Sequence, residues 1–325
     1  MTILVTGGAG YIGSHMVLEL IDHGYDVAIL DDLSTGCSAV IHKDARFFQG
    51  DVADEAIIDR ICQSCDISAV FHFAGSTSLP ESIGDPLRYF QNNTEASRAL
   101  VQNLLRYGVR HIVFSSTAAV YGATSSAPIA ETAPCQPASP YGWSKLFTEQ
   151  MLQDASRASG IGIAILRYFN VAGADPAGRI GQSTPDAQSL IKVACAVAAG
   201  KRDVLEIYGN DYATPDGTCV RDYIHVSDLV IAHRLALVAL QSGGANILCN
   251  LGYGKGHSVR EIADAVGRAA GAPLPVRNQP RRAGDQAIVI SNADLARERL
   301  GWTPAFDDID VILKTAFAWE NVPAR

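Results

Sequence analysis

The chain has 325 residues, of which 48% are hydrophobic and 18% are charged, and its formal net charge is −8. This length allows one large domain or two modest domains with a substantial core. The acidic balance argues against a general nucleic-acid binder, because phosphate neutralisation needs clustered lysines and arginines, and no apolar run approaches the ~20 residues of a membrane span.

The first half of the chain alternates short β-branched runs with amphipathic ones. This pattern predicts strands at 2–6, 26–30, 45–51, 69–75, 111–116 and 162–170, and helices at 14–24, 54–64, 87–107 and 141–159. Strands that alternate with helices are typical of βαβ units. We therefore expect an α/β fold, a Rossmann-type doubly wound parallel sheet covered by helices on both faces.

The amino-acid composition changes beyond Asn170, where Gly, Pro and Asp dominate. A helix that ends at Ala199 is predicted after this stretch. Further helices are predicted at 228–243, at 258–270 and in a segment ending near Trp319, with a strand at 246–252. We expect residues 1–170 to form a dinucleotide-binding domain, to which the chain returns near 225–252. Residues 171–325 would form a smaller C-terminal α+β domain for the substrate.

The first residues, MTILVTGGAG, run directly into a strand, so we expect no export signal and a cytoplasmic protein. Seven cysteines are scattered along the chain. Cys62 and Cys65 have C-x-x-C spacing, but no second pair or histidine partner is in register for zinc. Two reduced structural thiols are the favoured interpretation, and a thioredoxin-like redox pair is the alternative.

A glycine-rich turn, TGGAGYIGSH, joins the first predicted strand to the first helix and places Gly7, Gly10 and Gly13 at three-residue intervals. The first glycine of such a turn permits a tight bend, and the second lets the backbone approach a pyrophosphate. The third allows close packing of helix on strand, while the phosphates lie at the helix N-terminus. The context of strand, glycines and helix therefore predicts a dinucleotide site.

Asp31 ends the next predicted strand, where a carboxylate hydrogen-bonds the ribose hydroxyls of adenosine and repels a 2′-phosphate. No Arg or Lys lies between Gly13 and Lys43, so NAD is favoured over NADP. Asp51 and Val52 follow a short strand where adenine would lie. Residues 73–75, Phe73, Ala74 and Gly75, end a strand at the carboxyl edge of the sheet, where ligands of open α/β folds bind.

Tyr141 and Lys145 lie at i and i+4 of a predicted helix and hence on one face. A surface Tyr–Lys pair is common. The functional alternative is a phenol whose pKa is lowered by the neighbouring ammonium and by a cationic nicotinamide, so that it exchanges protons with a sugar hydroxyl near neutral pH. Thr117, which ends the strand IVFSST, would orient the same hydroxyl.

These motifs, in this order, resemble the extended short-chain dehydrogenase/reductase family. The stretches GNDYATPDGTCVRDYIHVSDL and RRAGD bring the resemblance closer still to the UDP-glucose (UDP-galactose) 4-epimerase family, over residues 2 to about 302. The resemblance implies that NAD also contacts Tyr11, Ile12, Asp32, Asn93, Ser115 and Tyr168. It implies substrate contacts by Thr117, Tyr141, Asn170, Ser189, Leu190, Tyr208, Arg221, Arg282 and Asp285.

The resemblance implies that Tyr141 takes the proton from the 4-hydroxyl of a UDP-hexose while a hydride leaves carbon 4 for the nicotinamide. The 4-ketose then turns over and receives the hydride on its other face. Lys145 would hold the nicotinamide ribose. Arg221 and Arg282 would bind the diphosphate, and Asp285 the uridine ribose, although Arg282 beside Arg281 could equally be a solvated pair.

Four residues depart from the family pattern. Thr77 stands where many relatives carry lysine. Near Ser189 and Leu190, many relatives have Asn-Leu or His-Leu followed by a proline, whereas this chain has Ser189 and Lys192. Val289 stands at a position whose bulk helps to decide whether a 2-N-acetyl group enters, so we expect UDP-N-acetylglucosamine to be accepted as well. The exact hexose stays open at this point.

Two other functions are compatible with the fold. A nucleotide-sugar 4,6-dehydratase would need the carboxylates that its family places directly after the threonine, where this chain has Ala118 and Ala119. A non-catalytic NAD-binding regulator would not need Thr117, Tyr141 and Lys145 together. The helices at 87–107 and 141–159 resemble those that pair across the two-fold axis of relatives, so the resemblance also implies a homodimer.

Overall fold

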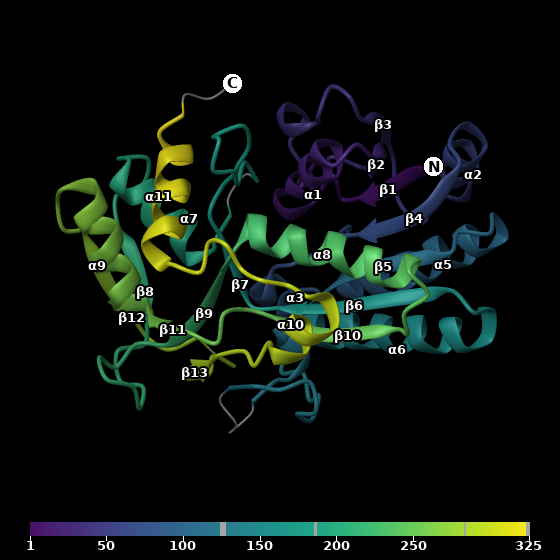
Figure 1. Ribbon diagram of the computed structural model, residues 1–325. Coiled ribbons are helices and arrows are strands. Elements are labelled where there is room, and N and C mark those ends of the chain that lie inside the picture. The colour runs from purple at the N-terminus through teal and green to yellow at the C-terminus, as the bar shows by residue number, and fades with distance from the viewer. Residues whose placement is uncertain (124–127, 185–186, 283, 323–325) are drawn as a thin grey trace.

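The computed structural model describes residues 1–123, 128–184, 187–282 and 284–322. Its main sheet has seven strands in the order β10-β6-β5-β4-β1-β2-β3, and every neighbouring pair is parallel (Figure 1). The strands are β1 Thr2–Thr6, β2 Asp26–Asp31, β3 Arg46–Gln49, β4 Ile67–His72, β5 His111–Thr117, β6 Gly162–Tyr168 and β10 Ile247–Leu251. The strand order reverses between β1 and β4, which is where open α/β sheets form their ligand crevice.

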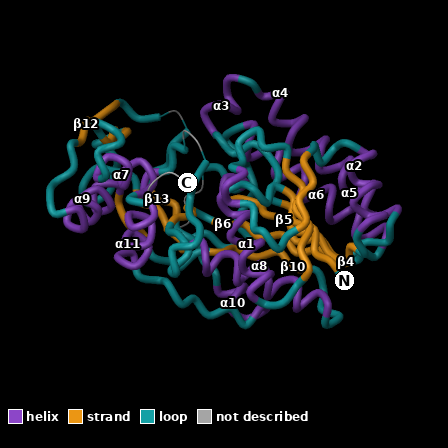
Figure 2. Tube along the Cα trace, turned by 90° about the horizontal axis from the view of Figure 1, so that it is seen from above, coloured by secondary structure: helices purple, strands orange, loops and turns teal. Residues whose placement is uncertain are grey.

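Helices cover both faces of this sheet (Figure 2). On one face lie α1, Tyr11–Asp22, and α8, Val226–Gln241; on the other lie α2, Glu55–Ser64, α5, Ala96–Arg106, and α6, Pro140–Ser159. Alternate strand residues enter different core clusters, so that Val5 and Ile29 join one while Leu4 and Leu30 join another. The predicted doubly wound α/β fold is therefore confirmed.

Several predicted boundaries were wrong: the strand predicted at 69–75 spans Ile67–His72, and three others differ for local reasons. Helix α1 begins at Tyr11 rather than at Ser14, because the glycine turn leads into the first helical turn without a side-chain cap. The helix predicted at 87–107 comprises α4, Pro86–Tyr89, a π-helical segment η2, Phe90–Glu95, and α5. The strand predicted at 162–170 ends at Tyr168, and Asn170 starts a strand of another sheet.

That other sheet joins β7, Asn170–Ala172, β9, Val220–His225, β11, Gly256–Ser258, and β13, Ile288–Val289, with β9 at its centre. Strands β8, Leu205–Tyr208, and β12, Val276–Gln279, pair separately. The remaining helices are α3, Leu79–Gly84, α7, Leu190–Ala198, α9, Val259–Ala270, α10, Asp294–Leu300, and α11, Ile309–Glu320, with short 3₁₀ turns η1, Ser38–Val40, and η3, Ala118–Val120. Most of these strands have two to four residues, too few for an alternating pattern to be recognised.

All seven cysteines are free thiols, including Cys62 and Cys65 at the end of α2. The C-x-x-C spacing therefore forms no disulfide. None of the described helices combines the length and the apolar character that a membrane span requires. The described residues also contain no group of His, Cys, Asp and Glu side chains fit to hold a metal ion.

Candidate active site

The glycine turn lies at the switch point, between the ends of β1 and β4 (Figure 1). A methyl group on Gly13 would lie 2.0 Å from the carbonyl oxygen of Gly7, so only glycine permits this packing of helix on strand. Gly7 itself has φ +69°, and a methyl group there would lie 2.7 Å from the amide nitrogen of Ala74. Because Gly10 caps α1 with no side chain, the first amides of the helix, those of Tyr11 and Ile12 among them, remain open to an anion.

Asp31 is held rigidly beside this turn. Its carboxylate accepts one hydrogen bond from the Ala9 amide at 2.9 Å and another from the Leu33 amide at 2.8 Å. Burial raises the pKa of Asp31, while these two amides lower it. Asp32 and Asp51 are exposed, and each carboxylate accepts from an amide two residues onward, whereas Val52 is buried.

On the other side of the switch point, Phe73, Ala74 and Gly75 follow β4. The Phe73 ring packs on His233 of α8 at 5.1 Å between centroids, and Gly75 takes φ +146° beside Asn93. Asn93 lies in the π-helical segment η2, a feature frequent at functional sites. Its side-chain oxygen accepts from the Ser76 amide at 2.7 Å, and its nitrogen donates to the Ser144 hydroxyl at 3.0 Å.

The strand end Ser115–Ser116–Thr117 organises the centre of the site. The carbonyl of Ser115 accepts a hydrogen bond from Lys145 Nζ at 3.1 Å, and its hydroxyl meets the hydroxyl of Tyr168 at 2.8 Å. Thr117 hydrogen-bonds Tyr141. The three residue types singled out in the sequence therefore converge at the carboxyl edge of β5.

Tyr141 is 9% exposed, and its ring meets Tyr89 edge to face at 6.4 Å between centroids. Burial raises the pKa of Tyr141, and the hydrogen bond with Thr117 opposes this rise. The predicted lowering by Lys145 was wrong for the protein on its own, because burial dominates. Any further lowering must come from groups that bind in the site.

Lys145 is 4% exposed, and its ammonium lies 4.8 Å from the centroid of the Phe114 ring. Burial lowers the pKa of Lys145 to about 8, and the carboxylate of Glu149 opposes this shift. Lys145 therefore carries its charge at neutral pH but loses it at mildly alkaline pH. A methyl group on Gly75 would lie 3.7 Å from Lys145 Nζ, so the ammonium faces the Gly75 backbone.

A second group of predicted residues lies in the C-terminal part of the chain. The guanidinium of Arg282 lies over the ring of Tyr208, 3.6 Å from its centroid. Arg281, in contrast, binds Asp211 and stacks on Tyr212, so the two arginines are not one solvated pair. Ala283, between Arg282 and Asp285, lies outside the described residues.

Arg221 and Asp285 approach each other, with Nη2 and Oδ1 3.7 Å apart. Arg221 also donates to the carbonyl of Val220 at 2.9 Å. Val289 is the register partner of Arg221, so the two residues are neighbours in adjacent strands. The position flagged for N-acetyl selectivity thus adjoins one of the two predicted diphosphate ligands.

The remaining predicted residues lie at the surface or in the core. Asn170 is exposed at the start of β7, and Thr77 is exposed just before α3. Ser189 caps α7, with its hydroxyl 3.2 Å from the side-chain oxygen of Gln182. Leu190 packs against the main hydrophobic core.

The sequence reasoning missed Ser76 and Ser144, which fix Asn93, and the buried pair Glu149 and Arg167. For Glu149 a signal existed. It continues the four-residue spacing of Tyr141 and Lys145 and so lies on the same helix face. The contacts of the two serines depend on the π-helical segment and carry no such spacing.

A family model described as the NAD dependent epimerase/dehydratase family matches residues 3–252 of the chain. A UDP-glucose 4-epimerase of Azospirillum brasilense is 52% identical over 98% of this chain and 92% of the relative. The crystal structure of UDP-glucose 4-epimerase from Brucella ovis in complex with NAD superposes with TM-score 0.94 at 42% identity, covering 98% of this chain and 97% of that one. The UDP-Glc/GlcNAc 4-epimerase of Campylobacter jejuni superposes with TM-score 0.85 at 43% identity, covering 98% of both chains.

Proposed function

The chain belongs to the NAD-dependent epimerase/dehydratase family, and from this premise we propose that it is an enzyme that interconverts the 4-epimers of a UDP-hexose. UDP-galactose and UDP-glucose are the expected pair. The reaction passes through a 4-keto sugar, so that carbon 4 is oxidised and then reduced with no net redox change. Because the reaction is near-balanced, metabolite levels would set its direction, whether in galactose metabolism or in the supply of polysaccharide precursors.

The residues at the switch point fit NAD. The space around Gly7 and Gly13 has no room for a methyl group, and the uncapped start of α1 suits a pyrophosphate. Asp31, held by two amides, suits the adenosine ribose. When bound, NAD supplies a reversible acceptor for the hydride of carbon 4.

Side chains of the protein transfer the proton of the 4-hydroxyl. Tyr141 takes the proton of the 4-hydroxyl and later returns it, as a general base and then a general acid. Thr117 bonds the phenol and orients it toward the sugar. The Lys145 ammonium, held by the carbonyl of Ser115, provides a donor for a ribose hydroxyl.

The observation that carries the proposal is the convergence of Thr117, Tyr141 and Lys145 with no carboxylate directly after the threonine. Ala118 and Ala119 form a short 3₁₀ turn there, and the amide of Ala119 donates to the Thr117 hydroxyl at 3.1 Å. A methyl group cannot remove the proton beside the ketone. The arrangement therefore favours epimerisation over dehydration.

We assign the nucleotide end of the substrate to the C-terminal part of the chain. Arg221 and Arg282 supply cations for the diphosphate, Tyr208 lies against Arg282, and Asp285 is placed to accept from a ribose. Binding energy from this remote group positions a sugar that must turn over between the two half-reactions. Asn170 would hydrogen-bond the diphosphate, and Ser189 and Leu190 would complete the sugar-side contacts.

The test is an assay of the purified protein with UDP-galactose and no added NAD. We expect UDP-glucose and no 6-deoxy product, because NAD stays bound through each turnover. A 6-deoxy-4-keto product would establish the dehydratase alternative, and no conversion despite bound NAD would establish the regulator. The same assay with UDP-N-acetylglucosamine tests Val289, and failure to convert this sugar alone would overturn the expected N-acetyl acceptance.

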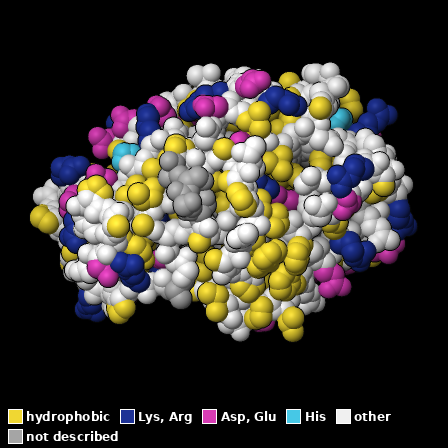
Figure 3. All heavy atoms as spheres, turned by 90° about the horizontal axis from the view of Figure 1, so that it is seen from below, with side chains coloured by type: hydrophobic (Ala, Val, Ile, Leu, Met, Phe, Trp, Pro, Cys, Tyr) yellow, Lys and Arg dark blue, Asp and Glu magenta, His cyan; other side chains and the backbone are white. Residues whose placement is uncertain are grey.

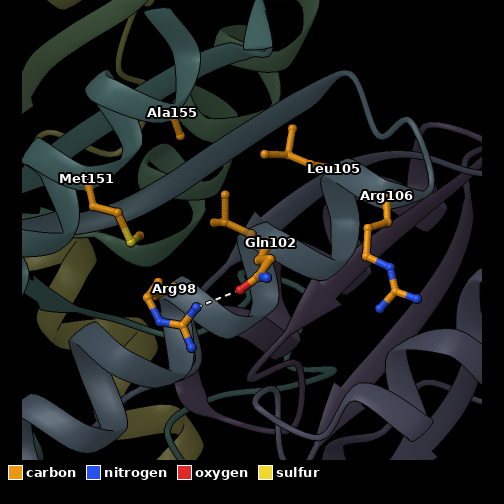
Figure 4. A pocket seen from close by; sticks show the side chains of 7 residues that line it. Arg98, Gln102, Leu105, Arg106, Met151 and Ala155 are labelled. Atoms are coloured by element: carbon orange, nitrogen blue, oxygen red, sulfur yellow. Dashed lines mark hydrogen bonds between the residues drawn. The ribbon is translucent and has the colours of Figure 1, made fainter. Parts of the chain in front are cut away.

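We also propose that the protein is a homodimer. Four large hydrophobic side chains of α3, α4 and α6 are at least a third exposed: Ile83, Leu87, Trp143 and Phe147. Figure 3 shows hydrophobic side chains gathered on the face seen from below, the side on which α6 lies in Figure 1. A groove of about 520 Å³ lies between α5 and α6, with Leu105 and Met151 among its lining residues (Figure 4). Met151 follows Phe147 by about one turn on α6, so the groove adjoins these side chains. Contiguous apolar surface of this kind is typical of a subunit interface.

Phe147→Glu is expected to convert the dimer into a monomer, because it places a charge in the middle of this surface. Sedimentation velocity at micromolar concentration measures the change. Val238→Glu is the matched control, since Val238 on α8 is comparably exposed but lies on the opposite face of the sheet. A monomeric wild-type protein would contradict the proposal.

We further propose that residues 1–170, with the returning segment near 225–252, form the NAD domain and residues 171–325 the UDP-sugar domain. Strand β10 of that segment is the seventh strand of the main sheet, which supports the division. A cytoplasmic location agrees with seven free thiols. Recovery of the protein in an exported fraction would contradict that location.

A further inference from the structure

A buried ion pair lies beneath the catalytic residues and takes no part in the mechanism described above. The Glu149 carboxylate, on α6, accepts two hydrogen bonds from Arg167 of β6. Nη2 donates to Oε2 at 2.5 Å, and Nε donates to Oε1 at 3.0 Å. The side chains of Arg167 and Glu149 are only 5% and 1% exposed. A buried pair of this kind is weak evidence for stability alone, because desolvation of both charges offsets their attraction.

The contacts of the pair lead directly to the reacting groups. Tyr141, Lys145 and Glu149 follow one another at four-residue intervals on α6 and so face β5 together. Glu149 accepts a hydrogen bond from the hydroxyl of Ser116. Ser115 and Thr117, the neighbours of Ser116 on β5, bind Lys145 and Tyr141 respectively. Each of these three strand residues therefore binds one of the three helix residues.

Arg167 ties the same carboxylate to more distant elements. Its Nη1 donates to the hydroxyl of Tyr121 at 3.0 Å, and that hydroxyl donates to the side-chain oxygen of Asn250 at 2.7 Å. Asn250 lies on β10 and its side-chain nitrogen donates to the carbonyl of Ile129 at 2.9 Å. The carboxylate is therefore fixed from α6, β5, β6 and, through this chain, β10.

On the basis of the proposed function, we propose that Glu149 and Arg167 are positioning residues of the epimerase reaction. The pair fixes the end of β5 against α6, and Glu149 supplies the negative charge that keeps the Lys145 ammonium protonated. Arg167 donates to both oxygens of that carboxylate and so fixes its position. The pair thus acts on the sugar through Lys145 and Tyr141 without touching it.

Among the described residues, Glu149 is the main negative charge near Lys145, because the other titratable groups that face the ammonium are neutral. From β4, His72 is neutral, since burial lowers its pKa to about 3 and both ring nitrogens are hydrogen-bonded. From β6, Tyr168 has a pKa raised by burial and is neutral, as is Tyr141 on α6 itself. Burial also raises the pKa of the Cys135 thiol beside the ion pair.

The test measures the pKa of Lys145 directly and does not depend on activity. The lysine side chains are labelled with ¹³C at Cε and titrated by NMR in the NAD-loaded protein, with the Lys145 signal identified by its loss in Lys145→Met. In Glu149→Gln we expect this pKa to fall by about one unit or more, the scale of a nearby opposite charge. The alkaline limb of the epimerase pH profile should move to lower pH by the same amount.

A second variant keeps the test valid if Glu149→Gln destabilises the protein by leaving the buried Arg167 without its counter-charge. The double variant Glu149→Gln with Arg167→Met removes both charges, and its Lys145 pKa should still lie below that of wild type. Asp154→Asn is the control, because it removes an exposed carboxylate of the same helix. An unchanged Lys145 pKa in the double variant would show that the pair has only a structural role. This outcome would overturn the inference even if the wild-type protein epimerises UDP-galactose as proposed.

Discussion

Tyr141→Phe is expected to lower kcat for UDP-galactose epimerisation by about 10²- to 10⁴-fold, the usual contribution of a positioned acid–base group. The substitution keeps the buried ring and its edge-to-face contact with Tyr89, and it removes only the hydroxyl. KM and the amount of bound NAD should change little, because neither depends on the transferred proton. Steady-state kinetics and the absorbance spectrum of the purified variant measure both.

The control for this prediction is Tyr107→Phe, which removes a phenol that is hydrogen-bonded to Asp59 outside the site. We expect its kcat to match that of wild type. If Tyr141→Phe retained more than a tenth of the wild-type kcat, another group would have to carry the proton.

Gly13→Ala is the second prediction with a large expected effect. Its methyl group would lie 2.0 Å from the Gly7 carbonyl oxygen and 2.8 Å from the Gly7 carbonyl carbon, both of them backbone atoms. The helix must therefore move away from the strand, at a cost of about 1–3 kcal/mol or more. We expect a lower Tm and purified protein that has lost most of its NAD.

Gly84→Ala is the matched substitution, because a methyl group on Gly84 of α3 would meet nothing within 4 Å. It should leave both Tm and the NAD content unchanged. Differential scanning calorimetry and the ratio of absorbance at 260 and 280 nm give the two readouts. Gly13→Ala protein with full NAD and a wild-type Tm would show that the turn has no role in cofactor binding.

The parts of the site that were predictable from the sequence are those set by local spacing. The glycine turn and Asp31 follow from single stretches of chain between a strand and a helix. The pairing of Tyr141 with Lys145 follows from the helical repeat. The same repeat reaches Glu149, but a glutamate on a helix carries no mark of its buried partner.

The features that were not predictable depend on long-range packing or on short elements. Asn93 lies in a π-helical segment that interrupts an otherwise regular helical pattern, so its contacts with Ser76 and Ser144 have no periodic signal. The stacking of Arg282 on Tyr208 joins residues 74 positions apart. The raised pKa of Tyr141 results from its burial, which spacing along the helix does not reveal.

The most direct test of the central claim follows the hydrogen of carbon 4. UDP-galactose carrying deuterium at carbon 4 is converted by the purified protein in ordinary water, without added NAD, and the UDP-glucose formed is analysed by mass spectrometry and NMR. If Tyr141 moves only the hydroxyl proton and the carbon-bound hydrogen returns to the same sugar, the product keeps its deuterium at carbon 4. Loss of the deuterium to solvent would contradict transient oxidation at carbon 4 as the route of epimerisation.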